Sequence, residues 1–160
     1  MNQKIRRATL ADAEHIGPVH AQAWRETYAG ILSDEWIANV SDEERIGRWK
    51  RILGEPNAAR QWVALVDGVV VGFAASGPPR DSEPARPLEL WSIHLLKAHS
   101  RAGIGTALVD TALGDAPASV WVVESNVPAQ HFYRALGFEP DGARKVNTDW
   151  EGVTEIRMTR

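Results

Sequence analysis

Apolar residues in the first third of the chain recur every three or four positions, a spacing typical of helices that bury one face. Further along, short apolar runs flank Asp67-Gly68, a dipeptide that favours a β-hairpin turn. The predicted strands span 5–8, 62–66, 69–75, 88–95, 119–124, 139–146 and 153–158, and the predicted helices cover a region around 16–24, then 33–53, 104–113 and 127–136. Strands that alternate with helices in this order predict an α/β domain with a mixed (α+β) sheet.

Local signals place several helix boundaries. Thr9 and Asp12 form the pattern of an N-cap followed by an acid three residues later, and Ser41-Asp-Glu-Glu44 repeats that pattern inside the second helical region. The second region is therefore expected to consist of two pieces, ending at Glu55-Pro56-Asn57. Gly17-Pro18 interrupts the first helical face, which predicts a kink or a restart there because an interior proline costs about 3 kcal/mol.

Composition narrows the class of protein. The 160 residues are expected to form one domain, 1–160, and the formal net charge of −3 argues against general nucleic-acid binding. The chain has no cysteine, which excludes disulfides and a cysteine nucleophile. Its N-terminus lacks the apolar core of a signal peptide, and no apolar run approaches the roughly 20 residues of a membrane span. These features predict a cytoplasmic protein that binds neither nucleic acid nor membrane.

The segment Ser100-Arg-Ala-Gly-Ile-Gly105 lies where a predicted strand gives way to a predicted helix. Two glycines let the backbone bend and approach a ligand, and the free N–H groups of the following helix suit a phosphate. Leu108 stands where a dinucleotide fingerprint needs a third small residue, and no P-loop sequence is present. The segment thus predicts a phosphate-bearing cofactor, with a simple turn as the alternative.

Three stretches together resemble one known family. Glu89–Gly105 is similar to a strand followed by the pyrophosphate loop Gln/Arg-x-x-Gly-x-Gly/Ala, and Val19–Leu32 is similar to a first-helix region rich in Trp and Tyr. Six residues match the motif Asn-x-x-Ala-x-x-Phe-Tyr-x-x-x-Gly-Phe: Asn126, Ala129, Phe132, Tyr133, Gly137 and Phe138. On these stretches the chain resembles the GNAT superfamily of N-acetyltransferases, in particular its small single-domain bacterial members. Ser100 and Lys97 depart from that pattern, which usually has Gln or Arg and Pro at these positions.

The resemblance implies catalytic roles for two residues. Tyr133 matches the tyrosine beside the coenzyme A sulfur, and a hydroxyl of pKa about 10 can return a proton to a thiolate whose thiol pKa is about 8.5. A core aromatic is the alternative for Tyr133. Glu89 resembles the strand glutamate that takes the proton of the amine through water, and a rim carboxylate that only attracts cations is the alternative. Alternation predicts that Glu89 shares a strand face with Trp91, Ile93 and Leu95.

The resemblance also implies binding residues. Asn126 would contact the cofactor, or else cap the helix that starts at Val127-Pro128. The remaining residues expected to bind acetyl-CoA are Ile93, His94, Leu95, Arg101, Ala102, Gly103, Ile104, Gly105 and Tyr133. Those expected at the acceptor site are Trp24, Glu26, Tyr28 and Trp91, with core packing as the alternative for Trp24. His94 and His99 lie five residues apart with no nearby carboxylate cluster, so no metal is expected.

The function implied is acetyl-CoA-dependent transfer of an acetyl group to a primary amine in a ternary complex. The amine could belong to a small molecule or to a peptide, and the sequence leaves this open. A non-catalytic acyl-CoA-binding or regulatory module with the same fold is the first alternative, and a protein that binds another nucleotide is the second. Relatives often form homodimers, and the oligomeric state of this chain also stays open.

Overall fold

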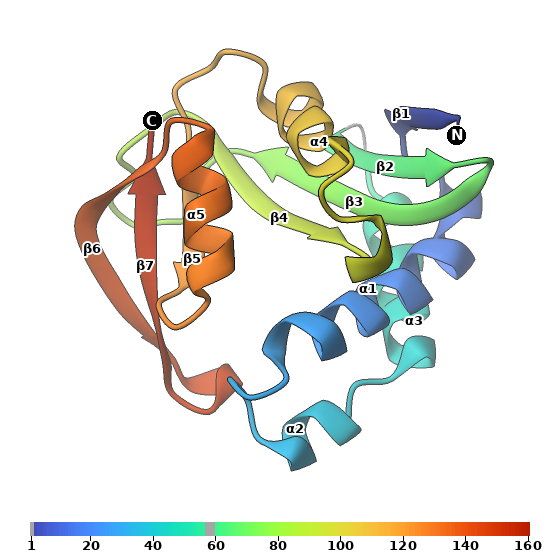
Figure 1. Ribbon diagram of the computed structural model, residues 1–160, viewed down its shortest axis with the longest axis horizontal. Helices are drawn as coiled ribbons and strands as arrows, with labels where there is room; N and C mark the ends of the chain where they lie inside the picture. The colour runs from blue at the N-terminus through green and yellow to red at the C-terminus, as the bar shows by residue number, and fades with distance from the viewer. Residues whose placement is uncertain (1, 57–59) are drawn as a thin grey trace.

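Seven strands form one mixed sheet, and five α-helices pack around it in the computed structural model, which describes residues 2–56 and 60–160 (Figure 1). The strands are β1 Gln3–Arg7, β2 Gln61–Val66, β3 Val69–Gly77, β4 Glu89–Leu95, β5 Ser119–Val123, β6 Glu139–Asn147 and β7 Val153–Thr159. The helices are α1 Ala13–Tyr28, α2 Asp34–Ala38, α3 Asp42–Leu53, α4 Ile104–Leu113 and α5 Val127–Ala135. This architecture confirms the predicted fold class.

Most predicted boundaries are confirmed because each rests on a local interaction. The Oγ atoms of Ser33 and Ser41 accept the N–H groups of Trp36 and Glu44, which begins α2 and α3 as separate helices. In the hairpin turn between β2 and β3, Asp67 and Gly68 have φ angles of 50° and 81°, the left-handed region expected of this turn. Asn57, which the sequence analysis places at the end of α3, lies outside the described residues.

The predicted restart at Gly17-Pro18 is wrong, because α1 runs through both residues without a break. Gly17 faces α3 so closely that a Cβ atom would lie 2.6 Å from the backbone nitrogen of Ile46. Buried residues on either side of Pro18, among them Ile16 and Val19, continue the same packed face. Tertiary packing therefore outweighs the local cost of the proline.

The helices divide between the two faces of the sheet. Leu108 and Val109 of α4 and Tyr133 of α5 pack in one core cluster with residues of β3, β4, β5 and β7. On the opposite face, α1 and α3 share a second cluster with β2 and β3 that includes Trp49 and Phe73. A third cluster joins the end of α1 to β5 and to the loop before β7, and its centre is Trp24 and Tyr28.

The sheet opens in its middle. The strand order is β1-β2-β3-β4-β5-β7-β6, and β4 and β5 are its parallel neighbours. These two strands pair only where they begin, at Glu89–Ser119 and Leu90–Val120. Beyond that point the two strands no longer pair, so backbone groups of β4 are free to bind a ligand.

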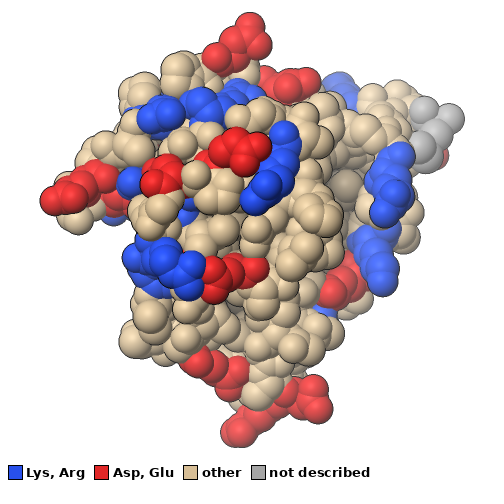
Figure 2. Space-filling view, turned by 60° about the vertical axis from the view of Figure 1, so that its left-hand side comes forward, with Lys and Arg blue, Asp and Glu red and all other residues tan. Residues whose placement is uncertain are grey.

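Acidic and basic side chains are intermixed over the face that contains β6 and β7 (Figure 2). Ion pairs account for part of this mixture, including Arg144 with Glu124 and Arg157 with Asp141. No helix of the described residues is both long enough and apolar enough to cross a membrane.

Candidate active site

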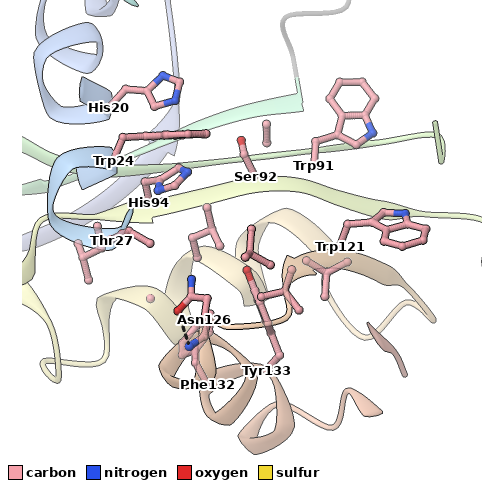
Figure 3. A pocket seen from close by; sticks show the side chains of 18 of the residues that line it. His20, Trp24, Thr27, Trp91, Ser92, His94, Trp121, Asn126, Phe132 and Tyr133 are labelled. Carbon is pink, nitrogen blue, oxygen red and sulfur yellow. Dashed lines mark hydrogen bonds between the residues drawn. The ribbon is translucent and has the colours of Figure 1, made fainter. Parts of the chain in front are cut away.

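A cavity of about 1350 Å³ lies at the opening between β4 and β5 and extends to α1, α4 and α5. Figure 3 shows Asn126, Phe132 and Tyr133 on one side of β4, and His20, Trp24, Trp91 and Ser92 on the other. Every binding or catalytic residue expected from the sequence lines this cavity except Ala102 and Ile104. The structure therefore brings together residues that are as much as 109 positions apart, from Trp24 to Tyr133.

The Ser100–Gly105 loop has the backbone that its glycines suggest. Gly103 lies immediately before α4 with φ +82°, and Arg101 also has a positive φ of 65°. Gly105 is in the first turn of α4, where a Cβ atom would lie 3.1 Å from the ring of Phe132 on α5. The side chain of Ile104 is buried in the core, so only its backbone could contribute to a phosphate site. The first N–H groups of α4 have no partner within the helix and lie beside the cavity.

A β-bulge interrupts β4 at the cavity. Ser76 of β3 pairs with Leu90, but Ala75 pairs with Ser92, which leaves Trp91 as an extra residue. Leu90 and Ile93 consequently both pack in the cluster under α4 although they are three residues apart. The predicted common face of Glu89 with Ile93 and Leu95 is therefore wrong, because alternation assumes a regular strand. Trp91 and Ser92 instead project to the same side of β4 (Figure 3).

Glu89 is the most deeply buried carboxylate at the cavity, with a relative exposure of 1%. Its Oε1 accepts the backbone N–H of Arg80 at 2.9 Å, and its Oε2 accepts a guanidinium N–H of the same residue at 2.9 Å. Glu89 is therefore not exposed at the rim of the cavity, and whether it acts as a base or only attracts cations stays a prediction. The pair with Arg80 also fixes the loop before β4 against the start of that strand.

Both tyrosines of the chain line the cavity and are buried. Burial raises the pKa of Tyr133 well above its ordinary value, and the nearby Tyr28 raises it further. Burial also raises the pKa of Tyr28, with the negative charge of Glu155 as a second cause. Tyr133 therefore keeps its proton at any pH near neutrality. Its hydroxyl points away from α5 into the cavity (Figure 3).

Asn126 caps α5, which confirms the helix cap given as its alternative role. Its Oδ1 accepts the N–H of Ala129 at 3.3 Å, which helps to begin the helix that carries Tyr133. A contact between Asn126 and a cofactor stays a prediction.

The residues expected at the acceptor site have distinct surroundings. Trp24 packs against Tyr28, with ring centroids 4.4 Å apart, and both side chains are buried. The indole N–H of Trp91 donates to the carbonyl of Pro78 at 2.9 Å. Glu26 reaches toward the turn that precedes the Ser100–Gly105 loop, since its Oε1 accepts the backbone N–H of Lys97 at 3.0 Å.

Two histidines face each other across α1 and β4. The rings of His20 and His94 stack with centroids 5.5 Å apart, and Nδ1 of His20 accepts the indole N–H of Trp49. Burial lowers the pKa of His20 to about 2 and that of His94 to about 4. Both imidazoles are therefore neutral near pH 7. Among the described residues, no group of three or more acidic or histidine side chains could hold a metal ion.

Several cavity residues escape the sequence analysis, notably Ser92, Trp121, Lys145, Trp150 and Glu155. Glu155 is one of several polar residues in β7, so nothing in the sequence alone singles it out as a cavity residue. The direction of Ser92 depends on the bulge in β4, and those of Trp121 and Lys145 depend on the pairing of β7 with β5 and β6. Trp150 lies in the short turn between β6 and β7.

The comparison with known proteins agrees with this geometry. Residues 21–138 match the acetyltransferase (GNAT) family. The uncharacterized N-acetyltransferase YuaI of Bacillus subtilis (strain 168) is 32% identical over 156 residues, which cover 93% of this chain and 86% of YuaI. The chain belongs to the GNAT family and is an N-acetyltransferase.

Solved structures share the fold. The PaiA N-acetyltransferase from Thermoplasma acidophilum, in complex with coenzyme A, superposes with a TM-score of 0.75 at 20% identity and 98% coverage of both chains. The Salmonella typhimurium protein yncA, solved with its cofactor acetyl-CoA, has a TM-score of 0.67 at 21% identity, covering 100% of this chain and 94% of its own.

Proposed function

We propose that this chain, as one domain over residues 1–160, transfers the acetyl group of acetyl-CoA directly to a primary amine in a ternary complex. The observation that carries the proposal is the cavity itself. It joins the glycine loop before α4 to the buried hydroxyl of Tyr133 and to the unpaired part of β4. Coenzyme A or acetyl-CoA is bound in the two solved structures of the same fold, which supports the choice of cofactor.

The cofactor would be held mainly by backbone groups. The N–H groups at Gly103–Gly105 would bind the pyrophosphate, and Arg101 would add a positive charge. The pantetheine arm would extend along the unpaired backbone of Ile93–Leu95. Bound acetyl-CoA supplies the thioester carbon that the amine attacks.

In the reaction, the nitrogen of a neutral amine forms a bond to the thioester carbon and the carbon–sulfur bond breaks. Tyr133 would give its proton to the leaving thiolate. The amine nitrogen loses a proton, which Glu89 would receive through water, because each of its oxygens has a second lone pair besides the one that Arg80 uses. Backbone N–H groups of β4 beside the bulge would polarise the carbonyl.

Acetyl-CoA and coenzyme A are expected to stabilise the protein, whereas ATP and NAD are not. At a hundredfold excess over Kd, a ligand that binds only the native state contributes about 2.7 kcal/mol, a rise in Tm of roughly 5–10 °C for a domain of this size. Thermal unfolding with each ligand measures this, and release of thiol with a panel of amines then measures turnover. Absence of a shift with both coenzyme A species would contradict the proposed cofactor, and binding without turnover would favour a non-catalytic module.

Replacement of Glu26 by alanine is expected to weaken acetyl-CoA binding by about threefold to tenfold. The carboxylate of Glu26 holds the N–H of Lys97 at the start of the turn that leads into the glycine loop. A hydrogen bond to a charged group contributes about 1.5 kcal/mol or more when shielded and less at an exposed site such as this one. Glu26→Gln keeps an acceptor oxygen and is the matched control. Calorimetric titration with coenzyme A compares the two, and equal affinities for Glu26→Ala and the unaltered protein would refute the role.

A further inference from the structure

Glu155 lines one end of the cavity. That end is formed by β6, β7 and the turn that holds Trp150. It is on β7, opposite Val123 of β5 and Lys145 of β6 in the register of the sheet. Its relative exposure is only 6%. None of the catalytic or cofactor-binding roles proposed above uses this carboxylate.

The charge of Glu155 is poorly compensated compared with that of two other buried carboxylates. Asp12 accepts two hydrogen bonds from the guanidinium of Arg6 at 2.8 and 2.9 Å, and Glu89 accepts two from Arg80. The partners of Glu155 among the described residues are distant. Nδ2 of Asn147 is 3.4 Å from Oε2, and Nζ of Lys145 is 4.0 Å from it. Burying a carboxylate without a close partner costs free energy, so Glu155 favours the binding of a cation beside it.

Aromatic side chains surround this end of the cavity. The rings of Trp24 and Trp150 are 4.7 Å apart and those of Tyr28 and Trp150 are 5.9 Å apart. Glu155 is close enough to Tyr28 to raise the pKa of its hydroxyl. Trp24 is 5% exposed, and its indole N–H has no partner among the described residues. Aromatic faces attract alkylammonium groups, and this attraction strengthens when water is excluded.

The side chain of Lys145 shows which kind of ligand suits the site beside Glu155. Its side chain is a four-carbon alkylammonium whose Nζ lies 4.1 Å from the ring centroid of Trp121 and 4.0 Å from Glu155. Half of that side chain is exposed, so it can move toward solvent when another cation arrives.

We propose that Glu155, with the rings of Tyr28, Trp24 and Trp150, binds a second cationic group of the acceptor, so that the acceptor is a diamine or polyamine. This inference rests on the proposed acetyl transfer. The nitrogen that reacts must be neutral, and a buried carboxylate with no close cationic partner, unlike Glu89 beside Arg80, would hold it as an ammonium ion. A carboxylate in this place therefore serves a nitrogen that does not react and stays charged throughout. Such an interaction is equally strong before and during the reaction, so it lowers KM without raising kcat.

The test compares 1,4-diaminobutane with 1-aminobutane, which lacks the second ammonium. The unaltered enzyme is expected to have a KM for the diamine about 10- to 100-fold below that for the monoamine, the size expected of a charged hydrogen bond. Glu155→Gln should remove most of this difference, leaving kcat within about threefold and the monoamine KM unchanged. Glu139→Gln, which removes an exposed carboxylate at the start of β6, is the matched control. Lys145→Met should lower the KM for the diamine, because it removes the competing ammonium.

Two results would overturn the inference. The first is that the unaltered enzyme has equal KM values for the two amines, or neither binds nor acetylates the diamine. The other is a Glu155→Gln enzyme that loses activity equally with both amines. In each case, continued stabilisation by acetyl-CoA and turnover of another amine would leave the proposed acetyl transfer standing. Loss of both the stabilisation and all turnover would instead refute that proposed function.

Discussion

Replacement of Tyr133 by phenylalanine is expected to lower kcat by about 100-fold or more, while the KM for acetyl-CoA changes by less than about threefold. General acid catalysis typically contributes a factor of 10² to 10⁴, and phenylalanine keeps the ring while removing the proton donor. The ring packs against Phe132 and Phe138, with centroids 5.4 and 5.9 Å away, and these contacts survive the change. Steady-state kinetics with a saturating amine measures both constants.

The raised pKa of Tyr133 adds a prediction about pH. Because burial disfavours the phenolate, the hydroxyl keeps its proton at pH values where an exposed tyrosine, with its pKa near 10, begins to ionise. The enzyme should therefore not lose kcat through ionisation of Tyr133 between about pH 8 and 10. A fall in kcat over this range that is absent from Tyr133→Phe would show that Tyr133 ionises there, which would contradict its raised pKa.

Tyr28→Phe is the matched control, since these two are the only tyrosines in the chain and burial raises the pKa of both. Tyr28 is at the end of α1 against Trp24 and Trp150, on the side of the cavity where the acceptor is proposed to bind. Its phenylalanine variant should keep kcat within about fivefold if only Tyr133 donates the proton. Similar losses in both variants would mean that a shared hydrogen-bond network, rather than one acid, is responsible.

The parts of the site that the sequence predicts are those encoded over a few consecutive residues. The loop from Ser100 to Gly105 needs a backbone that only a glycine-rich run supplies, and Gly103 has the positive φ expected there. Asn126 and the residues up to Phe138 belong to one short helix and its two ends, so their spacing fixes which of them face the core. Such local relations are visible in the order of the residues.

The parts that the sequence does not predict depend on contacts between distant segments. The bulge in β4 arises from its pairing with β3, and it reverses the expected face of Ile93 relative to Glu89. The pair of Glu89 with Arg80 needs the proline-rich loop to fold back over β4. Glu155 reaches the cavity only because β7 inserts between β5 and β6, an order that periodicity along the chain cannot reveal.

Replacement of Phe138 by alanine is expected to lower the free energy of unfolding by about 3–5 kcal/mol. Phe138 is completely buried beneath α5, in the cluster that also contains Leu108, Met158 and Tyr133. The guanidinium of Arg160 lies 5.1 Å from the centroid of its ring, so the change also removes a cation–π contact. Urea unfolding followed by tryptophan fluorescence measures the loss.

The same substitution should impair catalysis at temperatures where the variant is still folded. Phe138 supports the helix that positions Tyr133, and a cavity beneath that helix gives the hydroxyl more freedom than proton transfer tolerates. Phe138→Leu is the matched control, because it fills most of the volume and should cost about 1.5 kcal/mol or less. If Phe138→Ala unfolds more easily but keeps full kcat when folded, α5 positions Tyr133 without help from this residue. If kcat falls a little in Phe138→Leu and further in Phe138→Ala, in step with the loss of stability, the packing beneath α5 determines how well the proton donor is aligned.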